Sequence, residues 1–195
     1  MAKAGAPPKF MEAHVNWVFW KIASKEPMGR KEIVKETGLG EGSIRTILEK
    51  LDEYGLVKSA KIGRTLSDDG KKVRDSLRKI VEVRRIDQLK MSKGSKNVAV
   101  LVKGSSNKIK TGMEQRDAAI RIGRGGVTTL LYKKGKLIMP GFGDDMVLDK
   151  KYPEDSKAIL DAIEPQDGDV IVIGSEDSNQ KAEEAAWIGA STILS

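Results

Sequence analysis

Residues 28–66 constrain the fold of this chain more than any other segment. They contain two short helical patterns, joined by the glycine-bearing turn Gly38-Leu39-Gly40. The second pattern has apolar residues at the i, i+3, i+4, i+7 spacing that forms one stripe of a helix. These residues are Ile44, Ile47, Leu48 and Leu51. A Tyr-Gly-Leu-Val strand start and a short basic ribbon ending at Arg64 follow, and this order predicts a helix-turn-helix with a wing.

The side of the second helix that faces away from the apolar stripe carries small and polar residues. At about 3.6 residues per turn, the residues on that side are Gly42, Ser43, Arg45, Thr46, Glu49 and Lys50. Small residues let the backbone approach base edges, Arg45 can offer its guanidinium to a guanine, and the hydroxyls can bond to a base or a phosphate. An ordinary solvated face has the same residue types, but the complete motif favours contact with DNA.

A basic ribbon follows the two helices. Lys58, Lys61 and Arg64 surround Gly63, which can supply the positive φ of a tight ribbon turn. Such a loop can lie along a minor groove or a row of phosphates. The predicted DNA-binding residues are therefore Arg30, Lys31, Ser43, Arg45, Thr46, Lys50, Lys58, Lys61 and Arg64.

A further helix is predicted after the ribbon, with Ser67 or Asp68 as its N-cap. The order of two helices, Gly-Leu-Val, a basic wing and a Leu-Ser-Asp-Asp-Gly helix start resembles prokaryotic winged-helix transcription regulators over about residues 10–82. The resemblance implies a winged-helix fold with duplex DNA as a partner. It does not specify the DNA sequence that is bound.

The charge of the chain is concentrated in its first half. Residues 1–96 hold 22 Lys or Arg against 13 Asp or Glu, whereas residues 97–195 hold 13 against 15. A basic half beside a mildly acidic half is expected if only the first half faces a polyanion. A lysine-rich surface that only maintains solubility explains the excess of positive charge, but it does not explain why that excess lies in residues 1–96.

A length of 195 residues permits two small domains. We expect a flexible N-terminus at 1–9, a winged helix-turn-helix domain at 10–82, a polar linker at 83–96 and an α/β domain at 97–195. Within this division the alternation of Val81 and Val83 can instead mark a strand.

Composition narrows the classes of site that the chain can hold. With no cysteine there is no disulfide and no Cys-ligated metal, and the single His14 leaves little for a metal site or a Ser-His-Asp arrangement. We therefore expect no cofactor, no metal and no catalytic residues. The chain lacks a signal peptide and any apolar run of about 18 residues, which predicts a soluble cytoplasmic protein without a membrane partner.

The first predicted helix, Met11 to Lys25, has two apolar stripes. One is Val15, Val18, Phe19 and Ile22, and the other is Ala13, Trp17 and Trp20. The second stripe is covered either by one thick core or by another domain or subunit. Because winged-helix regulators pair on two-fold DNA sites, we expect a homodimer.

Strand and helix patterns alternate in the second half of the chain. Strands are expected at 97–103, 127–132, 136–139, 169–174 and 192–194, and helices at 111–122, 153–163 and 178–188. Such alternation predicts an α/β domain with a mixed, partly parallel sheet of about five strands.

Two loops of this half are candidates for binding a small-molecule, anionic effector. The glycine cluster Gly123-Arg124-Gly125-Gly126 lets backbone amides approach an anion, and Gly174 to Asp177 lies where a strand ends and a helix begins. The predicted ligand-binding residues are Glu114, Gln115, Arg116, Asp117, Arg124, Gly125, Gly126, Thr128, Gly174, Ser175 and Asp177. Plain turns and a salt-bridged helix face are the alternatives.

The charged Gly112-to-Asp117 segment, this glycine cluster and the Gly-Lys-Leu-Ile-Met-Pro-Gly segment resemble the second domain of a family of archaeal winged-helix proteins, whose role is uncharacterised. The whole chain is then expected to be a DNA-binding transcription regulator whose second domain senses an effector or mediates association. Two alternatives stay open. The winged helix can serve as a protein or RNA interaction module, or the second domain can house an enzyme that uses Asp117, Arg116 or Glu114.

Overall fold

The computed structural model describes residues 10–141 and 145–194. It comprises two compact units, one ending at Arg74 and one beginning at Asp75. Among the described residues, no helix is both long and apolar enough to cross a bilayer.

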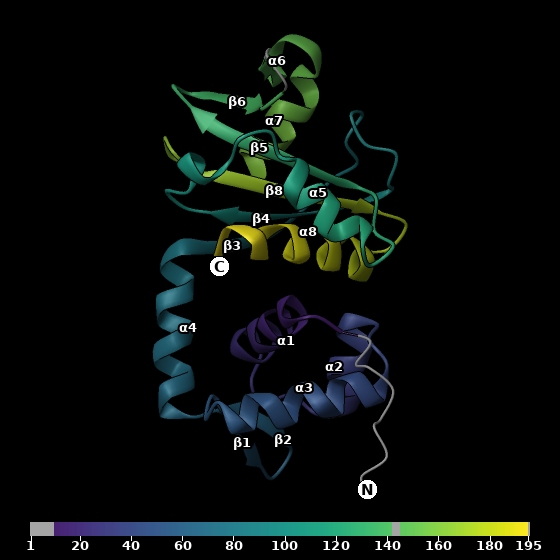
Figure 1. Ribbon diagram of the computed structural model, residues 1–195, viewed down its shortest axis with the longest axis vertical. Coiled ribbons are helices and arrows are strands. Elements are labelled where there is room, and N and C mark those ends of the chain that lie inside the picture. Colours follow the sequence, from purple (N-terminus) through teal and green to yellow (C-terminus); the bar gives the residue numbers. More distant parts are fainter. Residues whose placement is uncertain (1–9, 142–144, 195) are drawn as a thin grey trace, which may run out of the picture. The chain divides into compact units, whose positions relative to one another are not determined.

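The N-terminal unit consists of three helices, a β-hairpin and the start of a fourth helix (Figure 1). Its elements are α1 (Glu12–Ser24), α2 (Arg30–Thr37), α3 (Glu41–Glu53), β1 (Val57–Ala60), β2 (Gly63–Leu66) and α4 (Asp68–Ile80). The helices and hairpin predicted from residues 28–66 are present. The apolar stripe of α3 is buried as its spacing predicts: Ile44, Ile47, Leu48 and Leu51.

Glycines set the turns of this unit. Gly38 adopts φ 72° and ends α2 in a left-handed conformation. Gly63 has φ 139° and lies so close to the Met28 carbonyl that a side chain would displace it. Met28 and Arg64 exchange two backbone hydrogen bonds of 2.9 and 2.8 Å, so the segment before α2 extends the hairpin by one bridge.

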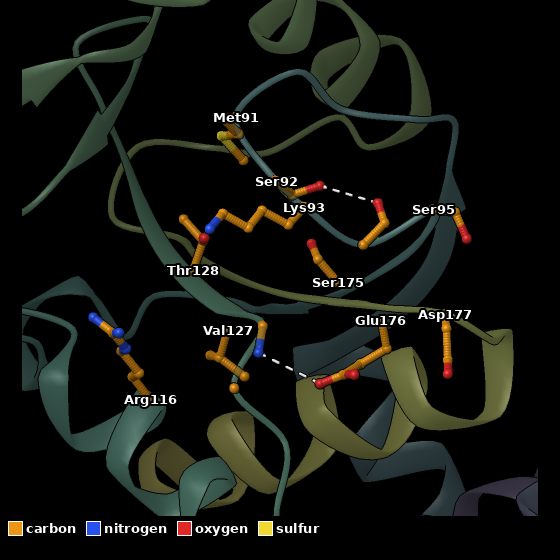
Figure 2. A pocket seen from close by; sticks show the side chains of 13 residues that line it. Met91, Ser92, Lys93, Ser95, Arg116, Val127, Thr128, Ser175, Glu176 and Asp177 are labelled. Atoms are coloured by element: carbon orange, nitrogen blue, oxygen red, sulfur yellow. Dashed lines mark hydrogen bonds between the residues drawn. The ribbon is translucent and has the colours of Figure 1, made fainter.

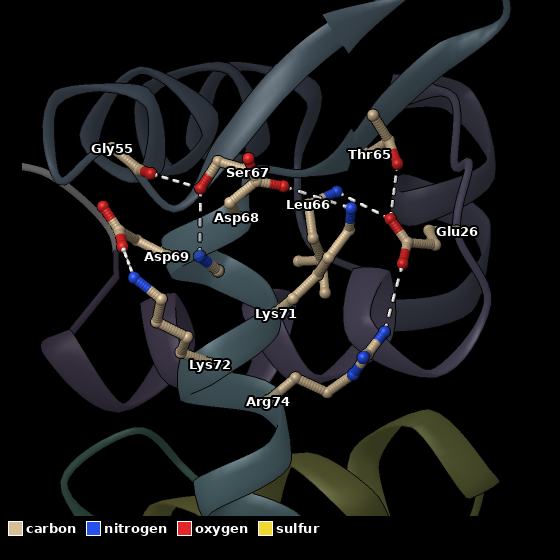
Figure 3. A network of polar contacts seen from close by, with 11 residues as sticks. Glu26, Gly55, Thr65, Leu66, Ser67, Asp68, Asp69, Lys71, Lys72 and Arg74 are labelled. Atoms are coloured by element: carbon tan, nitrogen blue, oxygen red, sulfur yellow. Dashed lines mark hydrogen bonds and ion pairs between the residues drawn. The ribbon is translucent and has the colours of Figure 1, made fainter.

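A carboxylate links the hairpin to the middle of α4 (Figure 3). Glu26 accepts hydrogen bonds from the Thr65 hydroxyl and from the Leu66 backbone N–H at 2.7 Å, and Arg74 approaches it to 3.4 Å. Ser67 is the N-cap of α4, because its hydroxyl accepts the Gly70 N–H at 2.9 Å. Burial raises the pKa of Glu26, but the hydrogen bonds from Thr65 and Leu66 and the charge of Arg74 outweigh it and leave that pKa below its ordinary value.

The C-terminal unit is built on one antiparallel sheet, which has six strands among the described residues, in the order β3-β4-β8-β5-β6-β7. The strands are β3 (Val81–Ile86), β4 (Lys96–Val102), β5 (Val127–Lys133), β6 (Lys136–Met139), β7 (Met146–Val147) and β8 (Val170–Glu176). The helices are the short 3-10 turn η1 (Ser106–Lys108), α5 (Met113–Ile120), α6 (Leu148–Lys151), α7 (Pro153–Ala162) and α8 (Asn179–Leu194).

Helices cover both faces of this sheet (Figure 1). On one face α8 packs on β8 and β4, and α5 packs on α8. The approach is close because Gly174 meets the α8 backbone at Ala182 and Gly189 meets the Val172 side chain. On the other face, the side chains of Leu101, Ile171 and Ile173 form a buried cluster with residues of α6 and α7 such as Leu148 and Ile159.

The expected parallel pairing is wrong: each strand pair in the sheet is antiparallel. β4 and β5 do run in the same direction, since both are antiparallel to β8, but β8 lies between them. The continuous apolar runs of β4 and β8 reflect burial on both faces, which helices produce for either strand direction.

Three other expectations about this half differ from the structure. Among the described residues the sheet has six strands rather than about five: four of the expected strands are present, β3 and β7 join them, and the expected strand at 192–194 is absent. Residues 83–86, expected in the linker, form part of β3, which pairs with β4 from Val81 to Ile86. The expected strand at 192–194 is the last turn of α8, where Ile193 is buried and Lys108 Nζ donates to its carbonyl at 2.6 Å.

Candidate functional sites

A groove of about 380 Å³ lies within the N-terminal unit, between the start of α2, the polar side of α3 and the hairpin. Three arginines from three different elements line it: Arg30, Arg45 and Arg64. Its other lining residues are Leu48, Glu49, Ser59, Ala60 and Gly63. The groove thus joins the predicted recognition surface of α3 to the predicted basic ribbon.

The polar side of α3 carries three exposed residues, Gly42, Arg45 and Glu49. The Arg45 side chain is 66% exposed, and its only ion pair among the described residues is a 4.0 Å contact with Glu49. Exposed pairs of this length hold a side chain weakly, so the guanidinium is available to a ligand. Ser43 and Thr46 are half-buried, and the Thr46 hydroxyl donates to the Gly42 carbonyl.

The remaining predicted cations fall into two groups. Arg64 is bound to Asp52 at 2.6 Å and to the Ser59 hydroxyl at 2.9 Å, and Lys50 lies 3.5 Å from Glu12. These two side chains are therefore engaged within the unit. The exposed cations that make no ion pair with any described residue are Arg30, Lys31, Lys58 and Lys61.

A second site, of about 720 Å³, lies within the C-terminal unit (Figure 2). Three stretches of chain surround it: the loop between β3 and β4, the loop that leads into β5, and the end of β8. Arg116 of α5 also lines it. The lining residues are Met91, Ser92, Lys93, Gly94, Ser95, Arg116, Gly125, Gly126, Val127, Thr128, Ser175, Glu176 and Asp177.

Glycines bring these stretches into backbone contact. A Cβ on Gly126 would overlap the Ser175 carbonyl, and one on Gly94 would lie 2.8 Å from the same oxygen and closer still to the Glu176 nitrogen. Ser175 N–H donates to the Gly126 carbonyl at 2.6 Å. Only glycine permits this approach, so the pocket wall is formed partly by main chain.

Two buried polar side chains hold the loop between β3 and β4. Asp155, at the start of α7 and 3% exposed, accepts the N–H groups of Lys90 and Met91 at 2.9 and 2.7 Å. Asn97 Oδ1 accepts the hydroxyls of Ser92 and Ser175 at 3.0 and 2.7 Å. The middle of the loop, from Lys90 to Ser92, is thereby held in place by the protein itself.

Opposite charges lie on opposite sides of the pocket. Figure 2 shows Lys93 and Arg116 on the side of Thr128, and Glu176 and Asp177 on the other side. Glu176 Oε1 accepts the Gly126 N–H at 3.4 Å. Asp177 is hydrogen-bonded to Lys181 at 2.9 Å, which lowers the pKa of Asp177.

The structure brings six of the predicted ligand-binding residues together in this pocket, namely Arg116, Gly125, Gly126, Thr128, Ser175 and Asp177. The other five do not line it. Gln115 is buried and donates to Thr192 at 2.7 Å, Arg124 pairs with Glu184 at 2.7 Å, and Gly174 packs against α8. Glu114 and Asp117 lie exposed on α5.

Residues 93–193 match the model of a family described as a domain of unknown function, DUF4443. The chain belongs to the DUF4443 family. Residues 18–72 match a second model, described as the PH0730-like N-terminal domain. A solved structure, the hypothetical protein PH0730 from the archaeon Pyrococcus horikoshii OT3, is 30% identical, with a TM-score of 0.75, covering 94% of this chain and 92% of that one. No curated protein matches the chain significantly.

Lining residues of this pocket that the sequence does not single out include Lys93 and Glu176, as well as the hydroxyl-bearing Ser92 and Ser95. The run Ser-Lys-Gly-Ser-Lys predicts a linker because it is polar and contains glycine. Gly94 is a usable signal, because a glycine, which has no Cβ, permits close approach of another backbone. Glu176 lies inside the predicted loop from Gly174 to Asp177, but the prediction does not include it.

Proposed function

We propose that this protein is a transcription regulator that binds duplex DNA through a winged helix in its N-terminal unit and senses a small molecule in its C-terminal pocket. In this proposal α3 is the recognition helix and the β1–β2 hairpin is the wing. The observation that carries the proposal is the groove in which Arg30, Arg45 and Arg64 meet beside the exposed side of α3.

The start of α3 adds a phosphate contact to this surface. Its N-cap, Gly40, has no side-chain cap, so the first amides of the helix are available to an acceptor. A phosphate at this point would also meet the positive end of the helix dipole. The sugar-phosphate backbone would then position Arg45 and Ser43 against base edges.

The exposed cations predict how binding depends on salt. Arg30, Lys31, Lys58 and Lys61 make no ion pair with described residues, so each can neutralise a phosphate without breaking an internal contact. Four such contacts give a slope of about −3 to −4 in a plot of log affinity against log salt concentration.

A small molecule bound in the C-terminal pocket can change the affinity for DNA only if it binds the DNA-competent and DNA-incompetent arrangements differently.

Selection of bound sequences from random duplex DNA tests the proposal, followed by titrations at fixed salt. Arg45→Ala is expected to cost about 1–3 kcal/mol on the selected site and to relax its sequence preference. Lys61→Ala should weaken selected and random duplexes equally and reduce the salt slope by about one. Lys134→Ala, an exposed lysine of the C-terminal unit, is the matched control.

Absence of duplex binding even in dilute buffer would overturn the proposal. Preferential enrichment of RNA over duplex DNA would reassign the N-terminal unit to an RNA interaction module. Unchanged affinity and preference in Arg45→Ala would remove that residue from base recognition.

A further inference from the structure

Two cationic side chains of the C-terminal pocket have no partner among the residues that the structure describes. Lys93, from the β3–β4 loop, and Arg116, from α5, make no ion pair or side-chain hydrogen bond with any described residue. Neighbouring charges behave differently: Arg124 is paired with Glu184 and Lys90 with Glu154. Two unpaired cations that enter one pocket from separate elements form a site for an anionic group.

Main-chain donors accompany these cations. Gly94 and Gly125 line the pocket, and a glycine can do so only with its backbone. Neither amide N–H has an acceptor among the residues that the structure describes. Amides exposed in glycine-containing loops are common ligands of carboxylate and phosphate oxygens.

On the opposite side of the pocket, Glu176 is a carboxylate that no charged group of the described residues neutralises. Asp177 is neutralised by Lys181 at 2.9 Å. Glu176 has a single partner among the described residues, the Gly126 N–H at 3.4 Å, which contributes no full charge. Glu176 is therefore free to accept hydrogen bonds from a cation that enters the pocket.

The size and composition of the pocket fit a small metabolite. A volume of about 720 Å³ lies within the range of ligand pockets. Met91 and Val127 supply apolar surface, while hydroxyls come from Ser92, Ser95 and Thr128. Such a pocket suits a ligand with a short apolar body and a charged group at each end.

We propose that this pocket binds a zwitterionic metabolite. Its anionic group, a carboxylate or a phosphate, is held by Lys93 and Arg116, and its ammonium group by Glu176. The inference deepens the sensing part of the proposed function, and rests on that function only for the link to DNA.

Three probes with the same carbon chain and different end groups test the charge pattern: ε-aminocaproate, adipate and hexamethylenediamine. Chemical-shift titrations of the full chain, without DNA, are expected to give the tightest binding for ε-aminocaproate. Adipate should follow, and the diamine should bind weakest. Phosphorylethanolamine in place of ε-aminocaproate distinguishes a phosphate from a carboxylate at the cationic side.

Two variants assign the ends of the ligand. Lys93→Met should raise the Kd for ε-aminocaproate about tenfold, because one charge-assisted hydrogen bond is lost. Glu176→Gln keeps an oxygen for the Gly126 N–H but removes the charge. The variant should therefore weaken the binding of ε-aminocaproate about tenfold. Its binding of adipate should be unchanged or tighter. Lys157→Met and Glu164→Gln, at exposed positions outside the pocket, are the matched controls.

Equal binding of all three probes, tighter binding of adipate than of ε-aminocaproate, or binding that Lys93→Met and Glu176→Gln leave unchanged would overturn the inference. So would the absence of shifts at the pocket residues with both ε-aminocaproate and phosphorylethanolamine. Because these titrations contain no DNA, their failure is distinct from failure of the duplex-selection experiment.

Discussion

Helix α3 of the N-terminal unit and the pocket of the C-terminal unit position their candidate functional residues in different ways. In the N-terminal unit one helix, α3, carries Ser43, Arg45 and Thr46, so their common direction follows from spacing along the sequence. In the C-terminal unit, three stretches distant in sequence form the pocket because β8 pairs with both β4 and β5. The part of the N-terminal surface that α3 supplies should therefore tolerate backbone changes that a site made of packed strands does not.

The largest expected effect is from Gly126→Ala. A Cβ at this position would overlap the Ser175 carbonyl, whose peptide is fixed in the central strand β8. Main chain cannot move aside as a flexible side chain can, so we expect a loss of about 3 kcal/mol in the free energy of unfolding. Urea denaturation and amide exchange of β5 and β8 measure it.

Gly125→Ala is the matched control for this substitution. Gly125 lines the same pocket, but nothing lies within 4 Å of the Cβ it would carry. We expect its unfolding free energy to change by less than about 0.5 kcal/mol. If Gly125→Ala destabilises the protein as much as Gly126→Ala does, backbone packing against β8 is not what shapes the pocket.

A smaller loss is expected from Asp155→Ala, which removes the acceptor of two backbone N–H groups in the pocket loop. Leaving these donors unsatisfied should cost about 2 kcal/mol of unfolding free energy. Amide exchange should accelerate at Lys90 and Met91. Asp161→Ala, an exposed position on the same helix α7, should leave both quantities unchanged.

The difference between the units also explains what could be predicted from the sequence. Helical spacing is local, and the helix predicted from Met11 to Lys25 is observed as Glu12–Ser24. The predicted strand at 136–139 is likewise observed. By contrast, no local pattern reports that β8 is inserted between β4 and β5, since that depends on long-range pairing.

In the candidate pocket, too, residues marked by a local sequence pattern are predicted and residues placed by long-range packing are not. The sequence predicts Gly125, Gly126 and Ser175 as ligand-binding residues because glycine loops and strand ends are recognisable in it. The sequence does not predict Lys93 as a ligand-binding residue, because the place of Lys93 in the pocket depends on Gly94 packing against β8. The sequence also predicts Arg124 as a ligand-binding cation. It does not show that Arg124 is paired with Glu184, which lies on a helix far along the chain.

Glu26→Gln probes the corresponding anchor of the N-terminal unit, with an expected cost of about 1 kcal/mol at neutral pH. The pKa of Glu26 is lowered in the folded chain, so its contribution to stability is complete above the ordinary glutamate pKa of about 4.3. That contribution is lost as the pH falls through the lowered folded value. Urea denaturation across this range should show the variant and the parent chain converging in acid.

An exposed glutamate on α3 provides the comparison for this pH effect. Glu53 makes no ion pair with any described residue, and Glu53→Gln should follow the pH dependence of the parent chain. If Glu26→Gln also follows the parent chain at every pH, the carboxylate does not anchor the hairpin to α4.

The smallest effect, and one of opposite sign, is expected from Gly42→Ala. Gly42 lies in the first turn of α3, is exposed, and has nothing within 4 Å of the Cβ it would carry. Alanine favours a helix over glycine, so the unfolding free energy should rise by about 0.5 kcal/mol. The added methyl group would nevertheless stand on the side of α3 that the proposal places against DNA. Duplex affinity, measured in parallel with urea denaturation, should therefore fall while stability rises. Equal DNA affinity in the stabilised variant would mean that the start of α3 does not approach the bases, and would leave only the hairpin and the groove arginines as the contact surface.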